Sequence, residues 1–184
     1  MRYRYFSLII LSLLFCGNLS SQTLTVNELI SWGRTDAGEV AEKLMKKGWS
    51  EHGYEIVQDS GFTRRTWMIK NNYNDLKSYF QYYISDADSL ENHIIYQFSD
   101  RNAFNSYRTD LKKMGYKLQK AKKKRRRKEK DKSKYKDKEE LFLYDKTNSL
   151  ISIKEVFLLG FNAFLVNAYN SKSRIAKNIL EEEK

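Results

Sequence analysis

The sequence predicts an α+β protein made of two tandem units, each with a helix packed over a four-stranded antiparallel sheet. Two segments with helical spacing of apolar residues end in similar motifs, LMKKGW at residues 44–49 and LKKMGY at residues 111–116. Each is followed by four short runs with strand-like alternation, separated by turn-forming residues. Because short turns join antiparallel neighbours, each group of four runs is expected to form a sheet under its own helix.

The first unit is assigned to residues 22–99. Its helix is expected to begin at Asp36 and to end before Gly48, because Asp36 with Glu39 resembles a capping box and glycine suits the position after a helix. A shorter helical pattern precedes it at residues 26–32. The strands of this unit are predicted at residues 49–58, 63–71, 78–85 and 92–98.

The second unit is assigned to residues 100–170 and repeats this order. Ser99 or Asp100 can cap its helix, and Gly115 is expected to end it. The strands of this unit are predicted at residues 116–121, 140–145, 150–157 and 163–169. Residues 171–184 form either a C-terminal tail or a short helix, and the sequence does not decide between the two.

This order of elements resembles that of the β-lactamase inhibitory proteins, secreted bacterial proteins in which two such units form a concave sheet that grips another protein. The resemblance covers residues 26–170 and rests on element order and on the paired helix ends KGW at residues 47–49 and MGY at residues 114–116. It implies a binding function, and it does not imply β-lactamase as the partner. The sequence departs from the family in lacking cysteines here and in carrying a basic insertion.

Residues 1–21 have the pattern of a secretory signal peptide. Arg2 and Arg4 precede an apolar run at residues 6–16, and small, mostly polar residues follow. A helix of that length rises only about 16 Å, whereas the hydrocarbon core of a membrane is roughly 30 Å thick. We expect cleavage near residues 20–21 and export to the bacterial periplasm or the extracellular space.

Cys16 is the only cysteine of the chain and ends the apolar run. A lipoprotein acylated at Cys16 is the alternative, which Phe15 disfavours because that processing requires a small residue before the cysteine. If cleavage follows Cys16, the exported chain has no thiol. Disulfides, thiol catalysis and cysteine-based metal sites are then excluded.

The net charge of +11 comes from one segment, the basic insertion at residues 117–138. It contains 14 Lys and Arg against three acidic residues, so the rest of the chain sums to zero. The candidate anion-binding residues are Lys122, Lys123, Lys124, Arg125, Arg126, Arg127 and Lys128. The insertion is either a solvated charge run or an arm that binds an anionic surface. Nucleic acid is disfavoured, because the protein is expected to be exported and the segment holds a single stacking residue, Tyr135.

Alternation along the predicted strands divides their side chains between two faces of the sheet. The more apolar set is assigned to the helix-covered face: Tyr54, Ile56, Trp67, Ile69, Phe80, Tyr82, Ile84, Ile94, Tyr96, Phe98, Leu141, Leu143, Ile151, Ile153, Phe164 and Val166. The mixed set is assigned to the open face: Arg64, Thr66, Met68, Tyr79, Gln81, Tyr83, His93, Ile95, Gln97, Phe142, Tyr144, Lys154, Asn167 and Tyr169.

Tyrosine is abundant in the chain, with 13 residues, and several are assigned to the open face. Tyrosine offers rigid, amphipathic contact area and is enriched at interface hot spots. The candidate binding residues are Met68, Tyr79, Tyr83, His93, Gln97, Tyr144 and Tyr169. The alternative is that these tyrosines only pair across strands on a half-solvated sheet.

Recognisable catalytic motifs are missing from the sequence. His52 and His93 do not share a metal-ligand spacing, and there is no His-Glu-x-x-His, Gly-x-Ser-x-Gly or glycine-rich phosphate loop. We therefore expect no enzymatic activity, no cofactor and no metal.

These observations predict an exported, inhibitor-like binding module that uses the open sheet face, with an envelope protein or a glycan as partner. The alternative is a surface-association protein whose basic insertion binds anionic lipid, lipopolysaccharide or polysaccharide. The sequence gives no indication of the oligomeric state.

Overall fold

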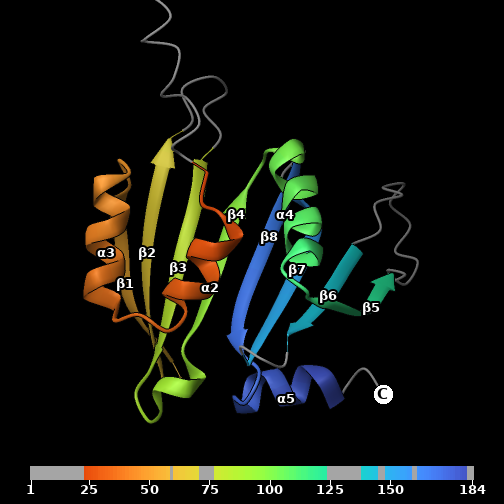
Figure 1. The fold of residues 1–184 in the computed structure, drawn as a ribbon. Coiled ribbons are helices and arrows are strands. Elements are labelled where there is room, and N and C mark those ends of the chain that lie inside the picture. The colour runs from red at the N-terminus through yellow and green to blue at the C-terminus, as the bar shows by residue number, and fades with distance from the viewer. Residues whose placement is uncertain are drawn as a thin grey trace, which may run out of the picture.

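The computed structural model describes residues 23–58, 60–70, 77–123, 138–144, 148–158 and 161–181 (Figure 1). The predicted signal peptide and most of the basic insertion lie outside these residues. The elements in chain order are α2 (Val26–Trp32), α3 (Ala37–Lys46), β1 (Ser50–Val57), β2 (Phe62–Lys70), β3 (Lys77–Ser85), the 3₁₀ turn η2 (Ser89–Glu91), β4 (His93–Phe98), α4 (Arg101–Lys113), β5 (Lys117–Lys123), β6 (Lys138–Tyr144), β7 (Ser149–Leu158), β8 (Phe161–Asn170) and α5 (Arg174–Glu181). The predicted strands agree with these bounds to within a few residues.

The eight strands form one antiparallel sheet, so the predicted division into two separate helix-on-four-strand units is wrong. The strand order is β1-β2-β3-β4-β8-β7-β6-β5, and β4 pairs with β8 from His93↔Tyr169 to Phe98↔Phe164. Two separate sheets would each leave an edge strand with unpaired backbone groups. Pairing of the last strand of each half satisfies those backbone groups. The sequence could not predict this pairing, because the periodicity of residues within a strand does not indicate which strand will be its neighbour.

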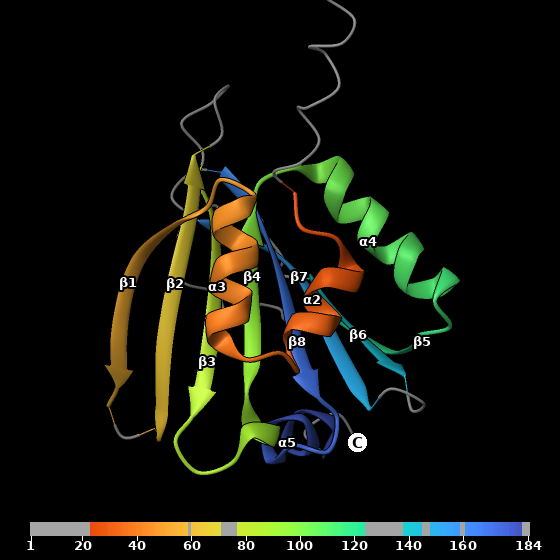
Figure 2. The same cartoon turned by 60° about the vertical axis from the view of Figure 1, so that its left-hand side comes forward.

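Helices α2, α3 and α4 all lie on one side of the sheet (Figures 1 and 2). One hydrophobic core lies between these helices and the sheet and draws from both halves of the chain, including Trp32, Trp67, Tyr96, Tyr107 and Phe164. Aromatic rings cross the β4–β8 junction, where the Phe98 and Phe164 centroids are 5.7 Å apart. The continuous core explains why the two halves form one body rather than two.

The helix ends follow the local sequence. The side chain of Asp36 accepts a hydrogen bond from the Gly38 amide and caps α3, as predicted, whereas Glu39 pairs with Lys43 instead of completing a capping box. Gly48 and Gly115 have φ of +84° and +87°, the left-handed conformation that favours glycine after a helix. The next residue closes each helix in the same way, with Trp49 N donating to Leu44 O and Tyr116 N to Leu111 O. The repeated motif therefore encodes a repeated helix ending.

The C-terminal segment contains a helix, α5, which lies across the lower end of the sheet in Figure 1. The carboxylate of Glu91 accepts hydrogen bonds from the first backbone amides of α5, those of Arg174 at 2.6 Å and Ile175 at 3.3 Å. An acidic side chain at a helix N-terminus is favourable. This contact ties α5 to η2, about 80 residues earlier in the chain.

The predicted faces of β6 are reversed. Phe142 belongs to the helix-covered core, whereas Leu141 aligns in register with Ser152 and Asn167 on the other face. Residues 141–143 are Leu, Phe and Leu, so alternation cannot choose between the two phases. The ion pair of Glu140 with Arg108 of α4 decides it, because Glu140 and Phe142 share a face.

Tyr54 and Ile56 are predicted to be covered by a helix, but they are 65% and 69% exposed. Their register partners, Arg65 and Thr63, place them on the same side as Trp67. However, β1 is the edge strand, and much of its length lies to the side of α3 (Figure 2).

No described helix is long and apolar enough to span a membrane.

Arg108→Ala is expected to lower the free energy of unfolding by about 2–3 kcal/mol, because it removes the ion pair that Arg108 forms with the buried carboxylate of Glu140. Urea denaturation measures this change. Arg101→Ala is the matched control, since Arg101 also lies on α4 and pairs with Glu155 in a more exposed position. We expect a loss of about 1 kcal/mol or less for the control. Equal losses in the two variants would contradict a special role for the Arg108–Glu140 pair.

Candidate binding face

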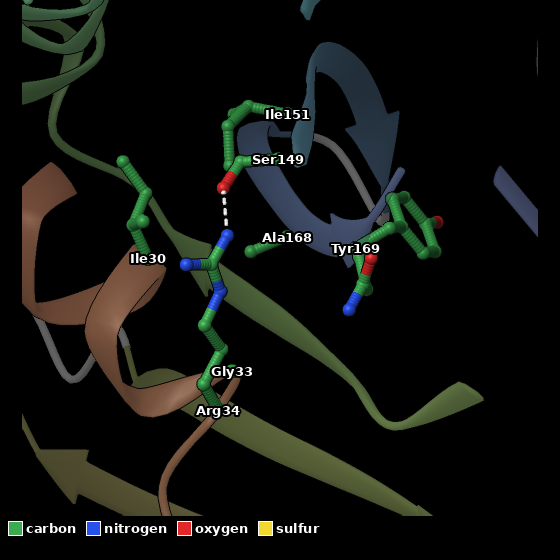
Figure 3. Close-up of a pocket in the computed structure, with 8 residues that line it drawn as sticks. Ile30, Gly33, Arg34, Ser149, Ile151, Ala168 and Tyr169 are labelled. Atoms are coloured by element: carbon green, nitrogen blue, oxygen red, sulfur yellow. Dashed lines mark hydrogen bonds between the residues drawn. The ribbon is translucent and has the colours of Figure 1, made fainter. Parts of the chain in front are cut away.

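We call the face of the sheet opposite α2, α3 and α4 the open face. Its part over β6 and β7 is covered, since Leu141, Leu150 and Ser152 are buried there. Over β2, β3, β4 and β8 it presents side chains in rows that cross the strands. Strand register aligns Arg64, Tyr83, His93 and Tyr169 in one row over β2, β3, β4 and β8. Figure 3 shows the ring of Tyr169 turned away from α2 and from Arg34, which lie on the covered side. We call this set of four residues the aromatic row.

The aromatic row is a continuous stack. The rings of Tyr83 and His93 have centroids 4.5 Å apart and an interplanar angle of 10°, and those of His93 and Tyr169 are 5.4 Å apart at 26°. Phe62 meets His93 edge-on at 5.4 Å. Offset and edge-on ring pairs stabilise each other beyond the area that they bury. The row is therefore held in place before any ligand arrives.

His93 is the centre of the stack and is only 9% exposed. Burial lowers the pKa of His93 below its ordinary value, since removing the ring from water disfavours the charged form. The ring nitrogen Nδ1 lies 3.2 Å from the carbonyl oxygen of Glu91. A carbonyl oxygen only accepts, so Nδ1 carries the proton and the neutral ring keeps Nε2 as an acceptor.

Arg64 ends the aromatic row at β2. Its Nη1 lies 3.4 Å from the Tyr83 hydroxyl, and its Nη2 lies 2.6 Å from the carboxylate of Glu55. The hydrogen bond to Tyr83, followed by that to Glu55, raises the pKa of Arg64 above its ordinary value. The cation is thus fixed beside the Tyr83 ring, 5.9 Å from its centroid, and its charge is balanced.

A second row, Met68, Tyr79 and Gln97, crosses β2, β3 and β4. All three side chains are half-buried, and the ring of His52 lies 6.1 Å from that of Tyr79. The intervening row is formed by Thr66, Gln81, Ile95 and Asn167. The centre of the open face therefore carries aromatic, amide and aliphatic groups without an unbalanced charge.

Six of the predicted binding residues lie on this face: Met68, Tyr79, Tyr83, His93, Gln97 and Tyr169. The side chain of Tyr144 lies outside the described part, and Phe142 belongs to the core instead. Sequence reasoning leaves Arg64 and Phe62 out of the candidate binding set. Arg64 could have been included from the sequence, because Glu55 and Arg64 have opposite charges and lie on neighbouring predicted strands.

Of the predicted anion-binding residues, Lys122 and Lys123 belong to β5, where they pair in register with Glu139 and Lys138 of β6. Lys124, Arg125, Arg126, Arg127 and Lys128 lie outside the described residues.

Among the described residues, no group of three or more His, Cys, Asp and Glu side chains could hold a metal ion. His93 is held by rings and by a backbone carbonyl. What the open face offers chemically is contact area with fixed hydrogen-bonding groups.

No protein-family model, no curated protein and no solved structure matches this chain.

His93→Phe is expected to reduce the acid sensitivity of the fold. Since the pKa of His93 is lowered in the folded state, the unfolded chain binds its proton first, and stability falls as the pH drops below about 6.5, the ordinary pKa of histidine. The stability that neutral His93 contributes is fully present above that pH. Urea midpoints between about pH 5 and pH 7.5 measure the effect.

His52→Phe is the matched control, since His52 lies in the exposed edge strand β1. The control is expected to keep the pH dependence of the wild-type chain. An unchanged dependence in His93→Phe would show that another group is responsible for the acid sensitivity.

Proposed function

We propose that this protein is an exported, non-catalytic binding module that holds a protein partner against its open face. The observation that carries the proposal is the aromatic row, a preformed stack over four adjacent strands, β2, β3, β4 and β8, at the end of the sheet next to η2. Tyrosine, histidine and amide side chains on a rigid surface give contact area and hydrogen bonds at a small entropic cost.

The dimensions of the face favour a protein partner. The aromatic row spans three strand spacings, about 14 Å, and the row through Tyr79 lies four residues away, about 13 Å. A broad surface of this kind suits another folded surface better than it suits a small molecule, which binds in concave pockets. Since Glu55 balances Arg64, the partner surface needs no strong charge of its own.

Tyr79→Ala combined with Tyr83→Ala is expected to weaken partner binding by about thirtyfold or more, the loss typical of a hot-spot residue. Cross-linking in an envelope extract identifies the partner, and titration with that purified partner measures the dissociation constant. The thermal midpoint of the double variant, measured in parallel, shows whether the fold persists.

Tyr54→Ala combined with Ile56→Ala is the control, because both residues are exposed at the edge of the other face. The control is expected to bind like the wild-type chain. If the two double variants bind the partner equally well, the open face is not the binding surface.

The charge distribution supports a second candidate function, docking on an anionic surface through the basic insertion. The cations at residues 122–128 are consecutive, and the segment around them carries the whole net charge of the chain. A Lys or Arg near an anionic membrane contributes about 1 kcal/mol, and salt weakens the attraction.

Replacing residues 124–128 by serine is expected to abolish binding to phosphatidylglycerol vesicles at low salt, because it removes five cations. Vesicle sedimentation at low and high salt measures binding, with phosphatidylcholine vesicles as the uncharged control. Binding that resists both the substitution and high salt would exclude electrostatic docking by this segment. Partner binding through the open face is expected to be unaffected.

A further inference from the structure

A cleft on the helix-covered side lies between the end of α2, η2 and the ends of β7 and β8. It consists of two adjoining hollows that share Gly33, Arg34 and Asn170 in their linings. Figure 3 shows the Arg34 side chain extending from the end of α2 towards Ser149, between the helix and the strands. The cleft and the aromatic row lie on opposite sides of the sheet, and Tyr169 of the row also borders the inner hollow.

Arg34 differs from most other arginines of the described chain. Four of these arginines form ion pairs with glutamates: Arg64 with Glu55, Arg65 with Glu51, Arg101 with Glu155, and Arg108 with Glu140. Within the described ranges, Arg34 has no such pair, and the one hydrogen bond of its guanidinium runs from Nη2 to the Ser149 hydroxyl at 2.8 Å. A guanidinium has five N–H donors, and Arg34 is exposed, so the donors that Ser149 does not use can reach a ligand from solvent.

The groups around Arg34 fit an anion with an apolar part. The outer hollow is lined by the neutral polar side chains of Ser89 and Asn92, and by Leu90, which is 46% exposed. The inner hollow is lined by Ile30 and Ala168. An exposed leucine in the same cleft as the Arg34 guanidinium favours an organic acid over an inorganic ion.

Asp36 restricts the charge of the ligand. Among the described residues it is the only acidic one that lines either hollow, and its carboxylate already accepts a hydrogen bond from the Gly38 amide at 2.7 Å. Its negative charge opposes a dianion more strongly than a monoanion. A single carboxylate is therefore a better match than phosphate.

We propose that this cleft binds a small monocarboxylate with an apolar substituent. Arg34 pairs with the carboxylate through two parallel N–H donors, the geometry in which arginine recognises carboxylates best. The side-chain oxygens of Asn92 and Asn170 already accept hydrogen bonds from the backbone amides of Ser85 and Lys172, so these residues donate to the carboxylate through their amide nitrogens. Leu90 packs against the apolar substituent.

The test uses N-acetyl-leucine as the probe and N-acetyl-leucine amide as its uncharged counterpart, titrated into the full chain by NMR. We expect backbone amide shifts at Gly33, Ser149 and Asn170 with the acid, and binding at least about tenfold weaker with the amide. Because this comparison uses the wild-type chain, it does not depend on how any variant folds. Equal binding of acid and amide, or no binding, would overturn the proposal.

Arg34→Gln is expected to weaken binding of the acid by at least about tenfold, since it removes the charged fork. Arg174→Gln is the matched control, because Arg174 is exposed on α5 outside the cleft lining and should leave binding unchanged. Inorganic phosphate is the third probe. Phosphate binding as tight as that of the acid would overturn the assignment to a monocarboxylate.

Discussion

The pairing of β4 with β8 is the interaction on which the rest of the structure depends. Six residue pairs, from His93↔Tyr169 to Phe98↔Phe164, join the last strand of each half of the chain. Backbone hydrogen bonds at this junction remove two sheet edges that would otherwise be exposed. The aromatic side chains on the helix-covered side of this junction pack into one core. The ring centroid of Phe164 of β8 lies 4.5 Å from that of Phe104 of α4, on which it stacks, and 5.7 Å from that of Phe98 of β4.

Both candidate sites exist because of this junction. On the open face it brings His93 of β4 beside Tyr169 of β8, which completes the aromatic row. On the covered side it brings Arg34, at the end of α2, within hydrogen-bonding distance of Ser149 at the start of β7. Neither the aromatic row nor the cleft could form within one half of the chain alone.

The two faces of the sheet differ in the environment of their polar side chains. On the covered face, the buried carboxylate of Glu140 is held in an ion pair with Arg108. On the open face, half-buried tyrosines and amides surround a neutral histidine, and Glu55 balances the single arginine of the row. A rigid surface without net charge, such as the open face, is suited to contact with another protein. Arg34 in its cleft has N–H donors that no described residue uses, so it is suited to a charged ligand.

The sequence by itself determined the local structure: the strand ranges, the glycines that end α3 and α4, and the alternation that separates Tyr79 and Tyr83 from Phe80 and Tyr82. These features depend on neighbours within a few residues, so periodicity and turn chemistry suffice. It also placed six of the candidate binding residues on the face opposite the helices.

Only the tertiary structure decided which edges of the two halves join, which face Phe142 takes, and that Tyr54 and Ile56 stay exposed. It also decided which rings stack on His93 and that Arg34 has no glutamate partner among the described residues. These outcomes depend on contacts between residues far apart in the chain, such as Arg34 with Ser149. Local patterning cannot encode them. A strand that is apolar on both faces can turn either face to the core, and the alternation of residues does not say which edge strands will pair.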